Sequence, residues 1–174
     1  TITITGPTAI NAGANNITLN NGTGTFGTLE ITGNDVVINE NAATDIGAST
    51  IAGNASFTST GNVTDGGTIA VTGNASFQGT AITLGDSSTA NFGSIDFVGT
   101  GAVTVSESSA TTVSGTSSAG AGLTLTSSSD VALDGAVTVT GNTIITAGST
   151  TGDIDVNAKL TGSGTILLDA GGSI

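Results

Sequence analysis

The chain lacks most of the side chains from which enzymes build catalytic and metal sites. Its 174 residues include no Cys, His, Met, Trp or Tyr, only five Phe and one Pro. Without His and Cys, no side chain has an ordinary pKa near neutrality. This excludes Ser-His-Asp and Cys-His catalysis, zinc sites of the His/Cys type and any disulfide framework.

Positive charge is just as scarce. Lys159 stands alone against 13 Asp and Glu, which gives a formal net charge of −12. One cation cannot neutralise several phosphates, so we expect no nucleic-acid partner, and an anionic membrane surface would repel the chain. No apolar run approaches the roughly 20 residues of a membrane-spanning helix, so we also expect no direct membrane insertion.

The abundant residues are those of short strands and tight turns. Thr makes up about a fifth of the chain, Gly occurs 28 times, and the mean hydropathy is +0.31, which argues against a disordered chain. Runs such as 68–71 and 136–139 alternate at period two between turn residues. Since no stretch repeats at period 3.6 over a dozen residues, the sequence predicts short strands and no substantial helix.

A 20-residue step runs through the first half of the chain. The pentapeptide Gly-Asn-Ala-Ser-Phe occurs at 53–57 and again at 73–77. The same step connects five glycines, each followed four residues later by an apolar residue: Gly13, Gly33, Gly53, Gly73 and Gly93, with Ile17, Val37, Phe57, Phe77 and Phe97. A 21-residue step then connects Gly120, Gly141 and Gly162. We interpret the Ser- and Thr-rich stretch 106–119 between the two series as an inserted loop or an irregular turn.

The step predicts one turn of a parallel β-solenoid, in which residues one step apart stack at about 4.8 Å. The expected inward columns are Ile31, Ile51 and Val71, and Val37, Phe57, Phe77 and Phe97. Asn34, Asn54 and Asn74 should form a turn ladder of side-chain amides, with positive φ at the neighbouring glycines. An antiparallel sandwich or barrel is the structural alternative, and contact between Phe57 and Phe77 distinguishes the two.

This pattern resembles the shaft repeats of filamentous haemagglutinin-type exoproteins. The similarity consists of Gly-Asn or Gly-Ser turns between short Val/Ile/Thr strands that recur at this step, and it covers essentially the whole chain. It implies a right-handed parallel β-helix from a large bacterial adhesin that a partner transporter secretes across the outer membrane. The Asn-Pro-Asn-type motif of that family's secretion domain is absent, because the only Pro is Pro7.

Carboxylates are the only candidates for chemistry. Asp153 and Asp155 alternate with an apolar residue, so both should point outward from one strand. A glycosidase needs two carboxylates beside its substrate, but substrate-holding aromatic and basic residues are scarce here, so a solvated strand face is the favoured interpretation. Asp45 and Asp65 lie one step apart, Asp86 follows after the next step, and a stacked pair would suit a hard cation such as calcium.

Thr-x-Thr pairs, of the kind that an ice-binding face uses, occur at Thr1-x-Thr3-x-Thr5, Thr124-x-Thr126 and Thr138-x-Thr140. An ice-binding face needs such pairs in the same column of every rung, and 20-residue steps from Thr1 or Thr3 do not produce that column. We therefore assign no catalytic, cofactor-binding or metal-binding residue and expect no enzyme. The prediction is an all-β parallel solenoid over 1–174, with roughly eight to nine rungs, forming one segment of a longer repeat protein.

The function that we expect is that of a structural or adhesive shaft in a secreted or cell-surface bacterial protein. Its binding region would lie elsewhere, toward a receptor on a host cell, a neighbouring cell or the matrix, and the open end rungs could associate end to end. The alternative is a calcium- or ligand-binding module of a surface or extracellular matrix protein.

Overall fold

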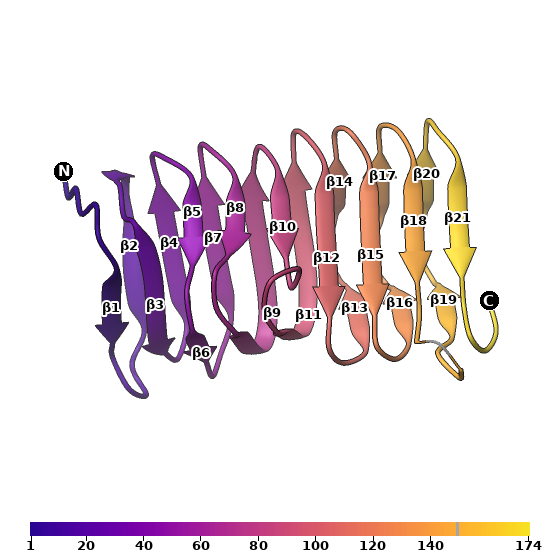
Figure 1. The fold of residues 1–174 in the computed structure, drawn as a ribbon, viewed down its shortest axis with the longest axis horizontal. Helices are drawn as coiled ribbons and strands as arrows, with labels where there is room; N and C mark the ends of the chain where they lie inside the picture. Colours follow the sequence, from indigo (N-terminus) through magenta and orange to yellow (C-terminus); the bar gives the residue numbers. More distant parts are fainter. Residues whose placement is uncertain (149) are drawn as a thin grey trace.

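The computed structural model describes residues 1–148 and 150–174, apart from the side chain of Asn21. It is an all-β solenoid of about eight turns, drawn lengthwise in Figure 1, and its strand pairings are parallel. The strands are β1 (Thr8–Asn11), β2 (Ile17–Gly24), β3 (Thr28–Gly33), β4 (Val36–Glu40), β5 (Thr44–Ile46), β6 (Ser49–Ile51), β7 (Ala55–Ser59), β8 (Val63–Asp65), β9 (Ile69–Gly79), β10 (Ile82–Leu84), β11 (Ala90–Gly99), β12 (Val103–Glu107), β13 (Thr111–Val113), β14 (Ser117–Ala119), β15 (Leu123–Ser127), β16 (Val131–Leu133), β17 (Val137–Val139), β18 (Thr143–Thr146), β19 (Ile154–Val156), β20 (Leu160–Gly162) and β21 (Ile166–Asp169). The predicted fold class is confirmed.

Each turn of the solenoid contributes three sides, and every side continues as a parallel ladder into the next turn. One turn, for example, comprises β7, β8 and the first part of β9. Alternate residues point inward, so the short strands show the burial pattern expected for a sheet with one buried face. No helix in the described part of the chain is long and apolar enough to cross a membrane.

The phenylalanine column is largely as predicted. Phe57 pairs with Phe77, which pairs with Phe97, and all three are fully buried. The residue below Phe57 is Ile38, however, and Val37 pairs instead with Ser56. The assignment of Val37 was wrong because the step between β4 and β7 is one residue shorter than the repeat, and a shift of one residue moves a side chain to the other face of the sheet.

The second predicted column needs a similar correction. Ile51 pairs with Val71 as expected, but the residue beneath Ile51 is Gly33 rather than Ile31. Ile31 is buried and pairs with Ile10 of β1. Both shifts arise because the corners between strands differ in length from turn to turn.

The inserted loop predicted at 106–119 is not found. This stretch contains the end of β12 and the whole of β13 and β14. Val113 pairs with Ile95 below and Leu133 above, so the ladder continues through this stretch in both directions. The Ser and Thr residues that suggested a loop lie partly in these strands and partly in the corners between them, the latter being Ser108, Ser109, Ser114 and Thr116.

The long side of the cross-section changes place along the rod. From β4 to β11, the five-residue strands lie on one side, formed by β4, β7 and the later parts of β9 and β11. Above the later part of β11, two short strands replace this straight side, since Ile95 pairs with β13 and Val98 with β14. β12 becomes the new long side, because its first residue pairs with Ile82 of β10 and its last with Ala90 of β11. We call this change of sides the β11–β12 junction.

The same change occurs once nearer the N-terminus. The straight strand β3 pairs with β5 at Thr28 and with β6 at Thr32, so a corner is introduced above it. The change coincides with the turn that begins with β4. We call it the β3–β4 junction.

Candidate functional site

A ladder of side-chain oxygens follows one corner of the rod. The Oδ1 atom of Asn54 accepts a hydrogen bond from the backbone N–H of Asn74 at 2.9 Å, and Oδ1 of Asp35 accepts from the N–H of Asn54 at 2.9 Å. Asn16 occupies the same position one turn lower, where it accepts from the N–H of Asp35. The predicted ladder therefore exists at Asn54 and Asn74, but Asn54 accepts from a backbone amide, and Asp35 stands where Asn34 was expected. The side chain of Asn74 instead accepts from the hydroxyls of Ser94 and Ser114 and donates to Asp96.

The glycines beside this ladder are needed for space rather than for positive φ. Gly53 and Gly73 do not have positive φ. A Cβ atom on Gly73 would approach the carbonyl oxygen of Gly53 to 2.7 Å, and it would also collide with Oδ1 of Asn54. The prediction of positive φ at Gly53 and Gly73 was therefore wrong. Glycine is needed at both positions because the turn below leaves no room for a Cβ atom.

The candidate calcium pair does not assemble. Asp45 pairs with Thr64 and faces outward, where its carboxylate accepts hydrogen bonds from the hydroxyls of Thr28 and Thr64. Asp65 pairs with Ile46 and is buried. Among the residues that the structure describes, no group of three or more His, Cys, Asp or Glu side chains is placed to hold a metal ion.

Asp153 and Asp155 have different roles. Oδ1 of Asp153 accepts hydrogen bonds from the backbone N–H of Ser173 at 2.6 Å and from its hydroxyl at 3.0 Å. These two hydrogen bonds lower the pKa of Asp153 below its ordinary 3.8. Asp155 is exposed on β19. Asp153 thus belongs to a turn ladder like that of Asn54, rather than to a pair of outward catalytic carboxylates.

Three carboxylates lie inside the rod, and only Asp65 among them was a candidate from the sequence. Glu40, Asp65 and Glu107 are each at most 4% exposed. Burial raises the pKa of all three above the ordinary range, and hydrogen bonds to each carboxylate oppose part of that increase. For Asp65 the donors are the N–H of Gly85 and the hydroxyl of Ser88, and the charge of Asp86 adds to the increase in pKa.

Glu40 and Glu107 occupy equivalent corners. Each ends a long strand and accepts a hydrogen bond from the backbone N–H of a phenylalanine in the turn below: Phe26 at 2.6 Å for Glu40, and Phe92 at 2.8 Å for Glu107. Each is also followed four residues later by a buried Thr. The repeated Glu-x-x-x-Thr spacing was visible in the sequence, but nothing in a single pattern indicated that these carboxylates were buried.

Glu107 differs from Glu40 in how its second oxygen is satisfied. Oε2 of Glu40 accepts a hydrogen bond from the Thr44 hydroxyl at 2.8 Å. Oε2 of Glu107 and Oγ1 of Thr111 are both buried, and the Thr111 hydroxyl lies close enough to lower the pKa of Glu107 in part without forming a full hydrogen bond. A buried charged oxygen without a full hydrogen bond is unfavourable, so burial at this corner disfavours the ionised form of Glu107.

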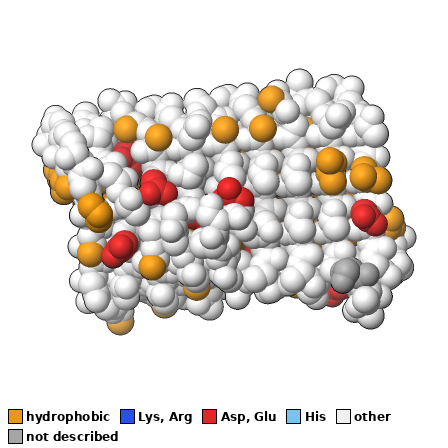
Figure 2. Space-filling view, viewed as in Figure 1, with side chains coloured by type: hydrophobic (Ala, Val, Ile, Leu, Met, Phe, Trp, Pro, Cys, Tyr) orange, Lys and Arg blue, Asp and Glu red, His pale blue; other side chains and the backbone are white. Residues whose placement is uncertain are grey.

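A threonine column follows the outer face of the side that becomes the long side at β12. Thr64, Thr83, Thr104 and Thr124 pair in succession, and Ile144 and Leu167 continue the column toward the C-terminus. Figure 2 shows neighbouring apolar side chains near that end of a surface that is otherwise mostly uncharged and polar, with scattered acidic side chains. The pair Thr124-x-Thr126 is not repeated in the neighbouring turns. Ser106 lies below Thr126, and Ile144 lies above Thr124, so these turns do not form an extended array of Thr-x-Thr pairs.

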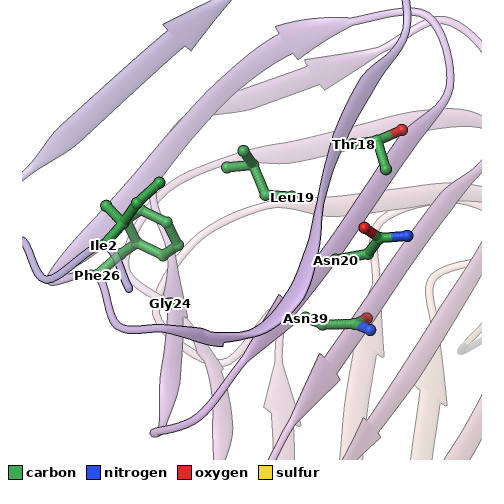
Figure 3. Close-up of a pocket in the computed structure, with 7 residues that line it drawn as sticks. All are labelled: Ile2, Thr18, Leu19, Asn20, Gly24, Phe26 and Asn39. Atoms are coloured by element: carbon green, nitrogen blue, oxygen red, sulfur yellow. The ribbon is translucent and has the colours of Figure 1, made fainter.

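A partly enclosed cavity of about 120 Å³ lies near the N-terminal end. Figure 3 shows its lining, in which Ile2 and Phe26 lie close together and the amides of Asn20 and Asn39 lie on the opposite side. Two further cavities, of about 400 and 280 Å³, lie along the strand faces beside β12 and β9. No ionisable side chain lines any of these three cavities.

Comparison with known proteins yields one family match. A family model described as "Repeats of unknown function (DUF5649)" matches residues 1–32, 33–99 and 100–159 in succession. The second and third matched segments begin three residues before β4 and β12, where the two junctions lie. No curated protein and no solved structure matches the chain.

Proposed function

We propose that this chain, which belongs to the DUF5649 family of repeats of unknown function, is a stiff structural spacer in a large secreted bacterial surface protein. The surface location and the bacterial origin come from the resemblance to filamentous haemagglutinin-type shafts. In this role the segment holds a binding region at a distance, and the chemistry of adhesion lies in other parts of the full polypeptide.

The observation that carries this proposal is the continuity of the ladders. The turns on either side of the β11–β12 junction are paired across it on each side of the rod, at Ala90 with Glu107, Ile95 with Val113 and Val98 with Ser118. A turn that is bonded on three sides to the turns above and below cannot tilt without breaking several hydrogen bonds. With about 4.8 Å per turn, eight turns give a rod on the order of 40 Å long.

The character of the surface supports the same role. Long polar strand faces and cavities without ionisable side chains offer little for catalysis. The net charge of −12 keeps such a rod soluble and discourages pairing of its edges with other chains.

Stiffness can be tested with two spin labels, since the chain has no Cys of its own. Thr64→Cys and Leu167→Cys place the labels on one outward column, five ladder steps apart, which corresponds to about 24 Å between the two backbones. A spacer gives one narrow distance distribution between the labels. A broad distribution would show that the segment bends and would contradict the proposal.

Two further measurements separate the spacer from its alternatives. The purified chain should show no saturable binding to bacterial cells, host cells or matrix polysaccharide, and saturable binding would assign the adhesive role to this segment itself. The melting temperature should be the same in calcium and in EDTA. A rise in calcium would favour the calcium-binding module instead.

A further inference from the structure

The two junctions share a chemical feature that the spacer role does not require. At each one a strand is interrupted, so that a phenylalanine N–H has a carboxylate as its hydrogen-bond acceptor. At the β11–β12 junction, the register between β9 and β11 shifts between Phe92 and Ser94, and Oε1 of Glu107 accepts from the N–H of Phe92. Buried amides need an acceptor, which explains why a glutamate side chain reaches into the rod at this corner.

The surroundings of Glu107 contain nothing that neutralises its charge. Among the described residues, Ala90 and Ser127 pair with Glu107, Phe92 and Ser109 donate to its carboxylate, the Thr111 hydroxyl also acts on it, and none of these side chains is ionisable. No charged side chain contributes to the shift of its pKa, which arises chiefly from burial. Lys159, the one Lys or Arg of the chain, lies in the corner before β20, two turns further along the rod.

Protonation of Glu107 would remove both its buried negative charge and the unpartnered carboxylate oxygen. A proton on Oε2 of Glu107 cancels the buried charge and converts the unpartnered oxygen into a donor, while Oε1 remains free to accept from Phe92. The Thr111 hydroxyl lowers the pKa of Glu107 as a donor to the ionised group, and because a hydroxyl both donates and accepts, it can instead accept from the protonated acid.

We propose that Glu107 is a proton-binding site that stabilises the β11–β12 junction. The protonated carboxylic acid holds the two matched repeat segments in register, and ionisation weakens the contact between them. The rod is therefore firmer in mildly acidic surroundings than at neutral pH. This proposal concerns the cohesion of adjacent repeats and stands independently of the spacer function.

The direction of the effect follows from linkage. A carboxyl group whose pKa is raised in the folded state binds protons more tightly there than in the unfolded chain. Stability therefore increases as the pH falls through the folded-state value toward the ordinary 4.5, and this gain is lost as the pH rises again.

The test compares wild type with Glu107→Gln, which carries an uncharged amide in place of the protonated acid. Urea unfolding between pH 8 and pH 5 should show a stability increase in wild type on acidification and a clearly smaller increase in the variant. Glu30→Gln is the matched control, because it removes one charge from an exposed site on β3, and its profile should run parallel to that of wild type. Equal slopes for Glu107→Gln and Glu30→Gln would overturn the proposal.

Two measurements on the wild-type chain keep the proposal testable if the Gln variant folds poorly. Carbon-detected NMR titration should place the midpoint of Glu107 above the ordinary 4.5, and a midpoint at or below that value would overturn the proposal. The amide of Phe92 should gain hydrogen-exchange protection between pH 8 and pH 5, after correction for intrinsic exchange, because proton binding by the folded state makes local opening at this corner less favourable. Unchanged protection would also contradict the proposal.

Discussion

The rings of Phe57 and Phe77 stack across neighbouring turns, with their centroids 5.6 Å apart and their planes within 6° of parallel. Parallel pairing aligns the two backbones, so identical side chains lie one above the other at the spacing of the turns. Phe92 meets Phe77 edge-on, with centroids 5.5 Å apart at 61°. These three rings belong to a core that also contains Phe26 and Phe97 and otherwise consists of aliphatic side chains.

Truncating either ring of the stacked pair should destabilise the rod strongly. Phe57→Ala and Phe77→Ala are each expected to lower the free energy of unfolding by about 3–5 kcal/mol, because each leaves a cavity in a fully buried site. A double-mutant cycle should give a coupling of about 0.5–1.5 kcal/mol. Chemical denaturation of the four proteins measures this, and a cycle between Phe57 and Leu133, four ladder steps away, should give no coupling above error.

Asn54 should matter more than Asn34, although the two residues follow glycines at equivalent places in the sequence. Asn54→Ala removes the acceptor for the N–H of Asn74 and should cost about 0.5–1.5 kcal/mol. The amide of Asn34 donates only to the side chain of Asn16, so Asn34→Ala should cost less. Hydrogen exchange at the Asn74 amide should accelerate in the first variant alone. Equal acceleration in both would contradict the ladder.

Gly85→Ala should be one of the most damaging small substitutions. Gly85 has a φ of +74°, which disfavours any side chain, and a Cβ atom there would collide with the carbonyl oxygen of Ser106. Its N–H also donates to both carboxylate oxygens of Asp65 at 3.0 Å. We expect a loss of at least about 1–3 kcal/mol in urea unfolding. Gly6→Ala is the control, because nothing lies within 4 Å of a Cβ atom there, and it should be close to neutral.

Asp153 should titrate below its ordinary pKa of 3.8, in contrast to the buried carboxylates. A lowered pKa means that its stabilising effect is complete above pH 3.8 and is lost as the pH falls from there through the folded-state value. Ser173→Ala should move the pKa of Asp153 part of the way back, because one of its two hydrogen bonds disappears. NMR titration of Asp153 measures the change, with Ser163→Ala as a variant at an unrelated corner. A midpoint that Ser173→Ala leaves unchanged would contradict this account.

The candidate sites show where sequence patterns mislead. Asp45 and Asp65 lie one repeat apart in the sequence and look like a stacked pair, yet the local step is shorter by one residue, so one faces water and the other the core. For the same reason, the residue of the phenylalanine column that lies below Phe57 is Ile38 rather than the predicted Val37. Strand geometry has a period of two, so an error of one residue in the step reverses the direction of a side chain.

The buried glutamates could not be recognised from the sequence for a related reason. Glu40 and Glu107 have ordinary polar neighbours in the chain, and a charged residue is expected on the surface. Their burial depends on an amide of the previous turn that lacks another acceptor, and that amide belongs to Phe26 in one case and to Phe92 in the other, both distant in the sequence.

The sequence by itself determined the class of the fold: alternating short strands, turn residues and a nearly constant step are sufficient for a parallel solenoid, because the stacking of turns requires only that similar side chains recur. The tertiary structure decided the register, since corner lengths vary between turns and only the pairing of backbones settles which residue lies above which. It also decided where the long side changes place and which carboxylates lie inside. These features depend on contacts between turns, and a single sequence carries no direct record of them.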